Sequence, residues 1–224
     1  MKKVLVGLVS AAALASVTVG MAAATNSMNA SSGNSFFNNS ASGIFISGNL
    51  GYGSVTAENS DYGLTPTSLN HDGLAWNVNL GYQFNPYFAV EVGYIAMPDV
   101  TANFAANIAN KATLDGFAID AKGILPINQK VDLFAKAGAI DMSQKQTVSV
   151  SGATADTVSG SAWTPELGLG ADYNVTKNVA ITLQDIYTMG AQYNGTDSQN
   201  LFSGTVTIPT TNSILVGASY KFSM

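Results

Sequence analysis

The chain has no cysteine, no arginine, a single histidine and very little charge. Only 10% of its 224 residues are charged, against about 25% in a typical soluble domain. Without cysteine, neither disulfides nor thiolate metal sites are available. The formal charge is -5 and all 9 basic residues are lysine. Such a chain lacks the basic patch that phosphate backbones require, which excludes nucleic acid as a partner.

Long apolar runs are also missing, except at the amino terminus. Lys2 and Lys3 precede an apolar segment, Val4 to Gly20, which is followed by Ala22-Ala23-Ala24. This order is typical of a secretory signal peptide, so we expect cleavage near Thr25 and export. A retained membrane anchor is the alternative, and the hydroxyl residues within the run disfavour it. No later stretch approaches 18 apolar residues, so no membrane-spanning helix is predicted.

Three parts are expected on this basis. Residues 1–24 form the signal peptide, residues 25–42 an Asn/Ser-rich flexible leader, and residues 43–224 a single domain. Cleavage would leave seven lysines against 14 acidic residues, so the mature chain carries a charge near -7.

The domain shows an alternation of apolar and polar residues with a period of two. Around Asn85-Pro86, for example, Val78 and Leu80 share one strand face while Asn77 and Asn79 share the other. Such alternation indicates β-strands, and Asn-Pro marks a tight turn. The same pattern predicts strands over residues 43–53, 74–84, 88–94, 116–125, 131–140, 163–175, 179–187 and 213–222.

The connections between these strands alternate strictly between short and long. Short turns are expected at residues 85–86, 126–130 and 176–178, and long polar loops at residues 58–72, 99–114, 143–161 and 190–211. Within the loops, residues 102–112 suggest a short helical turn and residues 146–150 an outward extension of a strand. Short turns at one end and long loops at the other predict an all-β, eight-stranded antiparallel up-and-down barrel in a bacterial outer membrane. Aromatic residues near the strand ends fit interfacial girdles.

Several segments resemble the transmembrane domain of the outer membrane protein A family. They are Gly81-Tyr82-Gln83-Phe84-Asn85-Pro86-Tyr87, Val90-Glu91-Val92-Gly93-Tyr94, Ala121-Lys122-Gly123 with Leu125-Pro126-Ile127, Thr164-Pro165, Gly170-Ala171-Asp172-Tyr173, Val175-Thr176, and Val216-Gly217-Ala218-Ser219-Tyr220-Lys221-Phe222. The resemblance implies an eight-stranded outer-membrane barrel. Two-domain members of that family continue into a peptidoglycan-binding domain. The chain stops two residues after Phe222, so that activity is not expected here.

Alternation directs a set of charged side chains into the barrel lumen. The candidate network consists of Glu91, Asp120, Lys122, Lys136 and Asp172, with Glu166, Gln184 and Lys221 also facing inward. Buried charges require partners, so Glu91 is expected to pair with Lys122 or Lys136. The network is either a structural plug or a gate on a narrow ion path. The family's gate is described with a Glu, a Lys and an Arg, and the position matching that Arg is Thr182.

Two further residues stand apart from this network. His71, beside Asp72, is expected to be a solvated loop residue, and a Ser-His pair with Ser68 or a distant serine is the catalytic alternative. No spacing matches a metal site, and no cofactor is expected. Asp185 falls among lipid-facing residues, where a carboxylate is unfavourable, so a bulge or a position at the rim is expected there.

The expected function is non-enzymatic. The barrel would be a monomeric structural and surface-interaction protein, in contact with outer-membrane lipid or lipopolysaccharide and, through its loops, with host or phage surface molecules. One alternative is a small pore of low conductance through the charged lumen. A second is an enzyme that modifies lipid A.

Overall fold

The computed structural model describes residues 42–56, 67–104, 107–197 and 203–222. The chain divides into two compact units, Met1–Ser32 and Gly33–Met224, and every described residue belongs to the second. The predicted signal peptide and all of the predicted leader except Ser42 lie outside the described residues.

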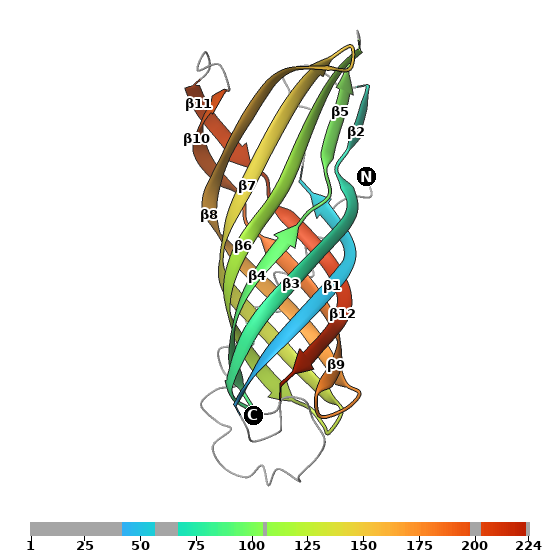
Figure 1. Ribbon diagram of the computed structural model, residues 1–224, viewed down its shortest axis with the longest axis vertical. Helices are drawn as coiled ribbons and strands as arrows, with labels where there is room; N and C mark the ends of the chain where they lie inside the picture. The colour runs from blue at the N-terminus through green and yellow to red at the C-terminus, as the bar shows by residue number, and fades with distance from the viewer. Residues whose placement is uncertain (1–41, 57–66, 105–106, 198–202, 223–224) are drawn as a thin grey trace, which may run out of the picture. The chain divides into compact units, whose positions relative to one another are not determined.

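Eight strands form a closed antiparallel barrel (Figure 1). They are β1 (Gly43–Val55), β3 (Asp72–Asn85), β4 (Phe88–Ala96), β6 (Ile108–Pro126), β7 (Val131–Val150), β8 (Ala153–Asn174), β9 (Val179–Thr188) and β12 (Thr211–Lys221). Each strand pairs with the next along this order, and β12 pairs with β1 from Phe45↔Lys221 to Val55↔Thr211. The predicted fold class is confirmed.

Four short strands lie at the long-loop end of the barrel, in segments predicted to be loops. They are β2 (Ser68–Asn70), β5 (Val100–Phe104), β10 (Ala191–Asp197) and β11 (Ser203–Ile208). β5 pairs with β6 and β2, while β10 pairs with β11 and β8 (Figure 1). The long-loop end therefore carries an extended sheet.

Two loop expectations are wrong. Of the described positions in residues 102–112 only Asn107 is 3₁₀-helical, and the others are strand because β5 pairs there with the start of β6. The expected loop at residues 143–161 is almost entirely strand: β7 and β8 continue to a tight turn at Ser151 and Gly152, both with positive φ. The expected extension over residues 146–150 is confirmed and proves to be longer.

Side chains that alternate in sequence face the barrel lumen and the outer surface in turn. Along β3, buried and exposed side chains alternate from Leu74 to Phe84. Leu80 is 52% exposed and Phe117 67% exposed, and many other large apolar side chains face outward in the same way. An apolar outer wall with a filled interior is the arrangement that suits hydrocarbon surroundings. Among the described residues, no helix is both long and apolar enough to cross a membrane.

Of the two expectations for Asp185, a bulge or a position at the rim, the bulge is not found. β9 pairs with both β8 and β12 without a register shift around this residue, opposite Leu169 and Ile214. Asp185 faces outward, three residues before the end of β9, and its Oδ1 accepts a hydrogen bond of 2.7 Å from Asn212 Nδ2. A neighbouring amide on the same outer face therefore satisfies the carboxylate in place of a bulge.

One glycine on the closing strand is required by close backbone approach. A Cβ at Gly217 would overlap the carbonyl oxygen of Gly48 and Oδ1 of Asn49, whereas a Cβ at Gly48 itself would meet nothing. We expect Gly217→Ala to lower the free energy of unfolding by about 1–3 kcal/mol, the usual cost of overpacking. Gly48→Ala should change it by no more than about 0.5 kcal/mol. Urea unfolding in phospholipid vesicles measures both, and equal effects would contradict the close approach.

Candidate functional site in the barrel lumen

The five predicted network residues lie together in the lumen, and each is at most 4% exposed. Strand register places Glu91 directly opposite Asp120, and Lys122 directly opposite Lys136. Like charges directly opposite one another are destabilising. Each lysine instead pairs with a carboxylate on an adjacent strand, two residues from the directly opposite position. The structure thus brings all five together as two adjoining lysine clusters.

The first cluster is centred on Lys122. Its Nζ lies 3.4 Å from Oε1 of Glu91 and 3.3 Å from Oδ2 of Asp172. The same Nζ stands 3.8 Å from the centroid of the Phe134 ring, a cation–π contact. Lys122 therefore bridges carboxylates on β4 and β8 across the lumen and rests on an aromatic face.

The second cluster is centred on Lys136. Its Nζ lies 3.2 Å from Oδ2 of Asp120 and 3.3 Å from Oε1 of Glu166. Oε2 of Glu166 also accepts a hydrogen bond of 3.4 Å from the Thr188 hydroxyl. Glu166 was predicted to face the lumen but not to belong to the network. Its place on the inward face of the predicted strand was the signal that could have assigned it to the network.

Thr182 is the residue that the resemblance places at the position of the family's gate arginine. Its hydroxyl donates a hydrogen bond of 2.6 Å to Oδ1 of Asp172 and lies 3.3 Å from the Ser219 hydroxyl. A hydroxyl can satisfy one carboxylate oxygen but brings no charge. Lys122 is accordingly the cation that contacts both Glu91 and Asp172.

Further polar pairs surround the two clusters. Nζ of Lys221 donates to Oε1 of Gln83 at 2.6 Å, and Nδ2 of Asn174 donates to Oδ2 of Asp132 at 2.6 Å. Asp132 was missed as a lumen carboxylate, although the alternation along β7 directs it inward with Lys136. These bonds make the lumen a dense polar interior of the kind expected in an eight-stranded barrel.

Apolar side chains close the lumen on both sides of the charged layer. Toward the short turns, Ile124, Phe134 and Ala89 each lie two residues nearer the strand end than Lys122, Lys136 and Glu91, and they form a buried cluster with Phe45 and Ala180. Toward the long loops lies a larger buried cluster. Its members are Val55, Ala75, Ile95, Met97, Val100, Ala112, Leu114, Ala118, Ile140, Met142, Ile186, Ile208 and Leu215. Buried apolar clusters therefore lie on both sides of the charged residues along these strands.

His71 and Asp72 form a separate pair at the long-loop end, with Nδ1 of His71 3.0 Å from Oδ1 of Asp72. Burial acts to raise the pKa of Asp72, but hydrogen bonding from Ser54 and the neighbouring His71 outweigh it and lower that pKa below its ordinary value. The Ser68 hydroxyl instead accepts a bond of 3.0 Å from Asn103 Nδ2. Within the described ranges, no group of three or more His, Cys, Asp or Glu side chains is arranged to hold a metal ion.

The geometry around Lys122 predicts a large stability effect. Lys122→Met would leave Glu91 and Asp172 buried without their shared cation, so we expect a loss of about 3–5 kcal/mol in the free energy of unfolding. The triple variant Lys122→Met, Glu91→Gln, Asp172→Asn should recover most of this loss, because it buries amides in place of charges.

Urea unfolding in phospholipid vesicles measures these effects. Lys130→Met, at the exposed turn after β6, is the matched control and should change stability by no more than about 0.5 kcal/mol. If Lys122→Met proved as mild as this control, a structural role for the network would be ruled out.

The fold and lumen can now be compared with known proteins. The family model for the OmpA-like transmembrane domain matches residues 29–224. A Coxiella burnetii (strain RSA 493 / Nine Mile phase I) protein described as uncharacterized is 26% identical over 227 residues, covering 84% of this chain and 88% of that protein.

Solved structures agree on the fold. Neisserial surface protein A (NspA) is similar with a TM-score of 0.54 and 14% identity, over 81% of this chain and 99% of that one. A major outer membrane protein from Thermus thermophilus has a TM-score of 0.52 and 12% identity, over 81% of this chain and 100% of that one. Because the family model spans most of the sequence, the chain belongs to the OmpA-like transmembrane domain family and is a barrel of the bacterial outer membrane.

Proposed function

We propose that this barrel is a non-enzymatic surface-interaction protein whose extracellular sheet contacts other molecules and whose lumen is a structural plug. In outer-membrane barrels short turns face the periplasm and long loops face outward. The sheet built on β6, β7 and β8 is then extracellular (Figure 1).

The length of β7 and β8 is the observation that carries the proposal. They contain 20 and 22 residues, whereas a tilted strand crosses a membrane in about 9–11 residues. Roughly ten residues of each strand, or roughly 30 Å of strand, extend beyond the hydrocarbon layer. β6 pairs with β7 along its whole length, and β5 and β10 widen the sheet on either side. An ordered surface of this size suits recognition better than a set of short loops would.

The chemistry of this sheet supports contact with a polar partner. Above Phe117 and Trp163 its outward face is rich in hydroxyl groups, from Thr113, Ser143, Thr147, Thr157, Ser159 and Ser161. Lys111 and Lys145 stand among them on neighbouring strands, and Lys111 pairs with Asp99 at 2.8 Å. Hydroxyl and ammonium groups bind sugars and phosphates, the groups that lipopolysaccharide and other cell surfaces present. Lipopolysaccharide and host or phage surface molecules are the partners we propose.

The layered lumen favours a plug over a pore. Water and ions passing through would have to cross both apolar clusters, and the lysines between them are already held by carboxylates. The enzyme alternative has less support. The described contacts of Ser68 and His71 are with Asn103 and Asp72 respectively, and they do not join the two residues as a nucleophile and base.

The plug predicts an electrically silent barrel. Refolded protein in planar bilayers should give no stable current steps, because the apolar layers exclude hydrated ions. Lys122→Met should remain silent as well, provided that it folds. Folding is checked by faster migration on gels before heating than after it. Reproducible steps that disappear in Lys122→Met would establish the pore instead.

Shortening the sheet tests the interaction role. Ser143 and Ser161 lie directly opposite each other, so an Asn-Gly turn replacing residues 144–160 should close the hairpin in register. Bacteria that express the wild-type chain should adhere to cultured epithelial cells several-fold more than cells without it. The shortened variant should lose this gain although its barrel folds.

A change at the other end of the barrel is the matched control. Replacing Asn128 and Gln129 by Gly and Ser alters only a periplasmic turn, so adhesion should stay at the wild-type level. Equal adhesion by wild-type, shortened and vector-only cells would contradict the proposed function.

A further inference from the structure

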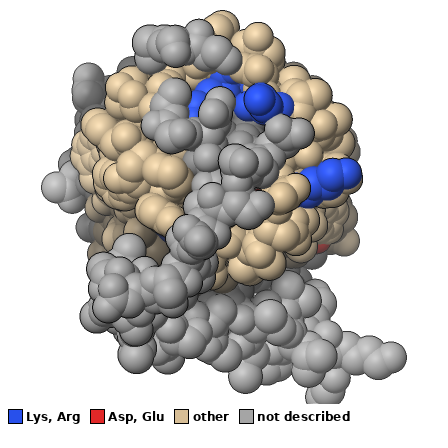
Figure 2. All heavy atoms as spheres, turned by 90° about the horizontal axis from the view of Figure 1, so that it is seen from below, with Lys and Arg blue, Asp and Glu red and all other residues tan. Residues whose placement is uncertain are grey.

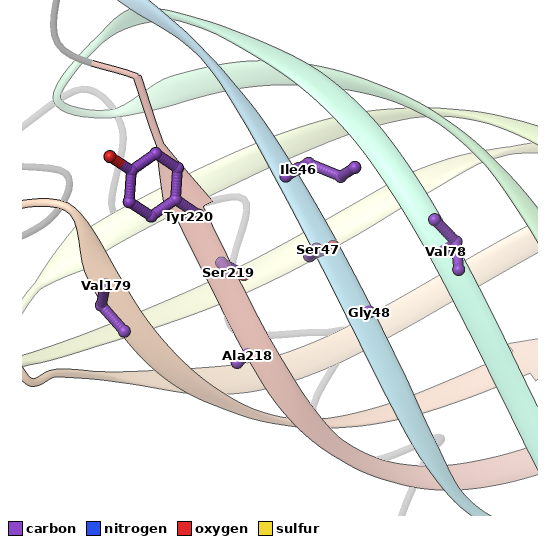
Figure 3. A pocket seen from close by; sticks show the side chains of 8 residues that line it. All are labelled: Ile46, Ser47, Gly48, Val78, Val179, Ala218, Ser219 and Tyr220. Carbon is purple, nitrogen blue, oxygen red and sulfur yellow. The ribbon is translucent and has the colours of Figure 1, made fainter.

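A groove of about 390 Å³ lies on the outer wall of the barrel, where the last strand meets the first (Figure 3). Its lining residues are Ile46, Ser47, Gly48, Val78, Val179, Ala218, Ser219 and Tyr220. Ser47 and Ser219 are buried and bond within the lumen. The side chains that the groove presents to the membrane are therefore apolar, apart from the hydroxyl of Tyr220.

Register explains why the wall is hollow here. Gly48 lies between Ala218 on β12 and Val78 on β3, so two of the smallest residues are cross-strand neighbours. The next row toward the periplasm holds Ile46 beside Tyr220, whose larger side chains border the hollow. Because a Cβ at Gly48 would meet nothing within 4 Å, the space above this pair is open.

A turn that carries a lysine borders the periplasmic end of the groove. Val179 pairs with Tyr220 and begins β9, two residues after Lys177, which is exposed in the turn. This turn is fixed to the end of β12: the Lys221 amide donates to the Asn178 carbonyl at 2.8 Å, and Asn178 Nδ2 donates to the Lys221 carbonyl at 2.7 Å. In Figure 3 the Tyr220 hydroxyl points away from Gly48 and Ala218. An apolar trough thus leads toward a lysine and a phenol donor.

The charged residues in the turns at this end of the barrel are all positive. Its described turns carry Lys130 and Lys177 and no acidic residue. Figure 2, which looks at this end, shows blue lysine side chains at separate places and hardly any red on the described surface. A positive rim beside hydrocarbon attracts anionic lipid headgroups.

We propose that this groove is a binding site for one anionic phospholipid of the periplasmic leaflet. An acyl chain would lie over Gly48 and Ala218 between Ile46, Val78 and Val179. The phosphate would accept hydrogen bonds from Nζ of Lys177 and the hydroxyl of Tyr220. The lipid would then cover the seam where β12 closes the barrel on β1. This inference does not depend on the proposed extracellular function.

Native mass spectrometry tests the site on the whole folded chain in mild detergent. Titration with dioleoyl phosphatidylglycerol should give a one-to-one complex that forms more readily than with dioleoyl phosphatidylcholine. Gly48→Leu fills the groove and should reduce the complex at least several-fold, and Ala218→Leu should do the same. Lys177→Gln should weaken phosphatidylglycerol binding roughly fivefold, as expected for one lysine at an anionic membrane surface.

The chain offers matched controls for both parts of the site. Gly123 faces outward on β6, on the opposite wall, and a Cβ there meets only the Ala135 carbonyl oxygen at 3.8 Å. Gly123→Leu and Lys130→Gln should therefore leave binding unchanged. Equal losses in Gly48→Leu and Gly123→Leu would overturn the proposal. So would a dimer that only Gly48→Leu dissociates, because a second copy would then be the occupant.

Discussion

The whole structure depends on closing the backbone hydrogen-bond ladder between β12 and β1. Hydrocarbon offers no partner to an exposed amide or carbonyl, so a sheet that crosses a membrane must have no free edge. The register from Phe45↔Lys221 to Val55↔Thr211 meets this requirement over eleven residue pairs. Closure also demands that backbones approach closely, and for this reason Gly217 tolerates no side chain against the Gly48 carbonyl. The small residues at the seam have a second consequence, the groove on the outer wall.

Closure at eight strands fixes what the interior can hold. A cylinder this narrow is filled by side chains, and the polar ones must satisfy one another. Lys122 and Lys136 each contact two carboxylates, and the Thr182 hydroxyl supplies a further hydrogen bond to Asp172. The network is buried between two apolar clusters, and burial strengthens its ion pairs and makes any unpaired member costly. The arrangement favours a rigid plug.

The sequence predicted those features that follow from a period of two. Strand order, the inward direction of Glu91 and Lys122 and the outward aromatic residues all follow from alternation. The partner of each lysine could not be read in the same way, because it depends on register and twist between strands far apart in sequence. The alanine-rich hairpin at β5 and the upper part of β8 were missed for another reason, and of the upper part of β7 only residues 146–150 were expected as strand. Their Ala, Ser and Thr residues show little apolar alternation, and pairing with neighbours decides their conformation.

The two ends of the barrel are built under different constraints. At the periplasmic end short turns such as Thr176 to Asn178 are bonded to neighbouring strands, and lysines suit an anionic leaflet. At the outer end β7 and β8 rise far past the length that the membrane requires. Neither closure nor filling of the lumen explains that extra length. Since residues that stability does not demand are the ones free to serve recognition, the hydroxyl-rich sheet above Trp163 is where the specific activity of this barrel is to be sought.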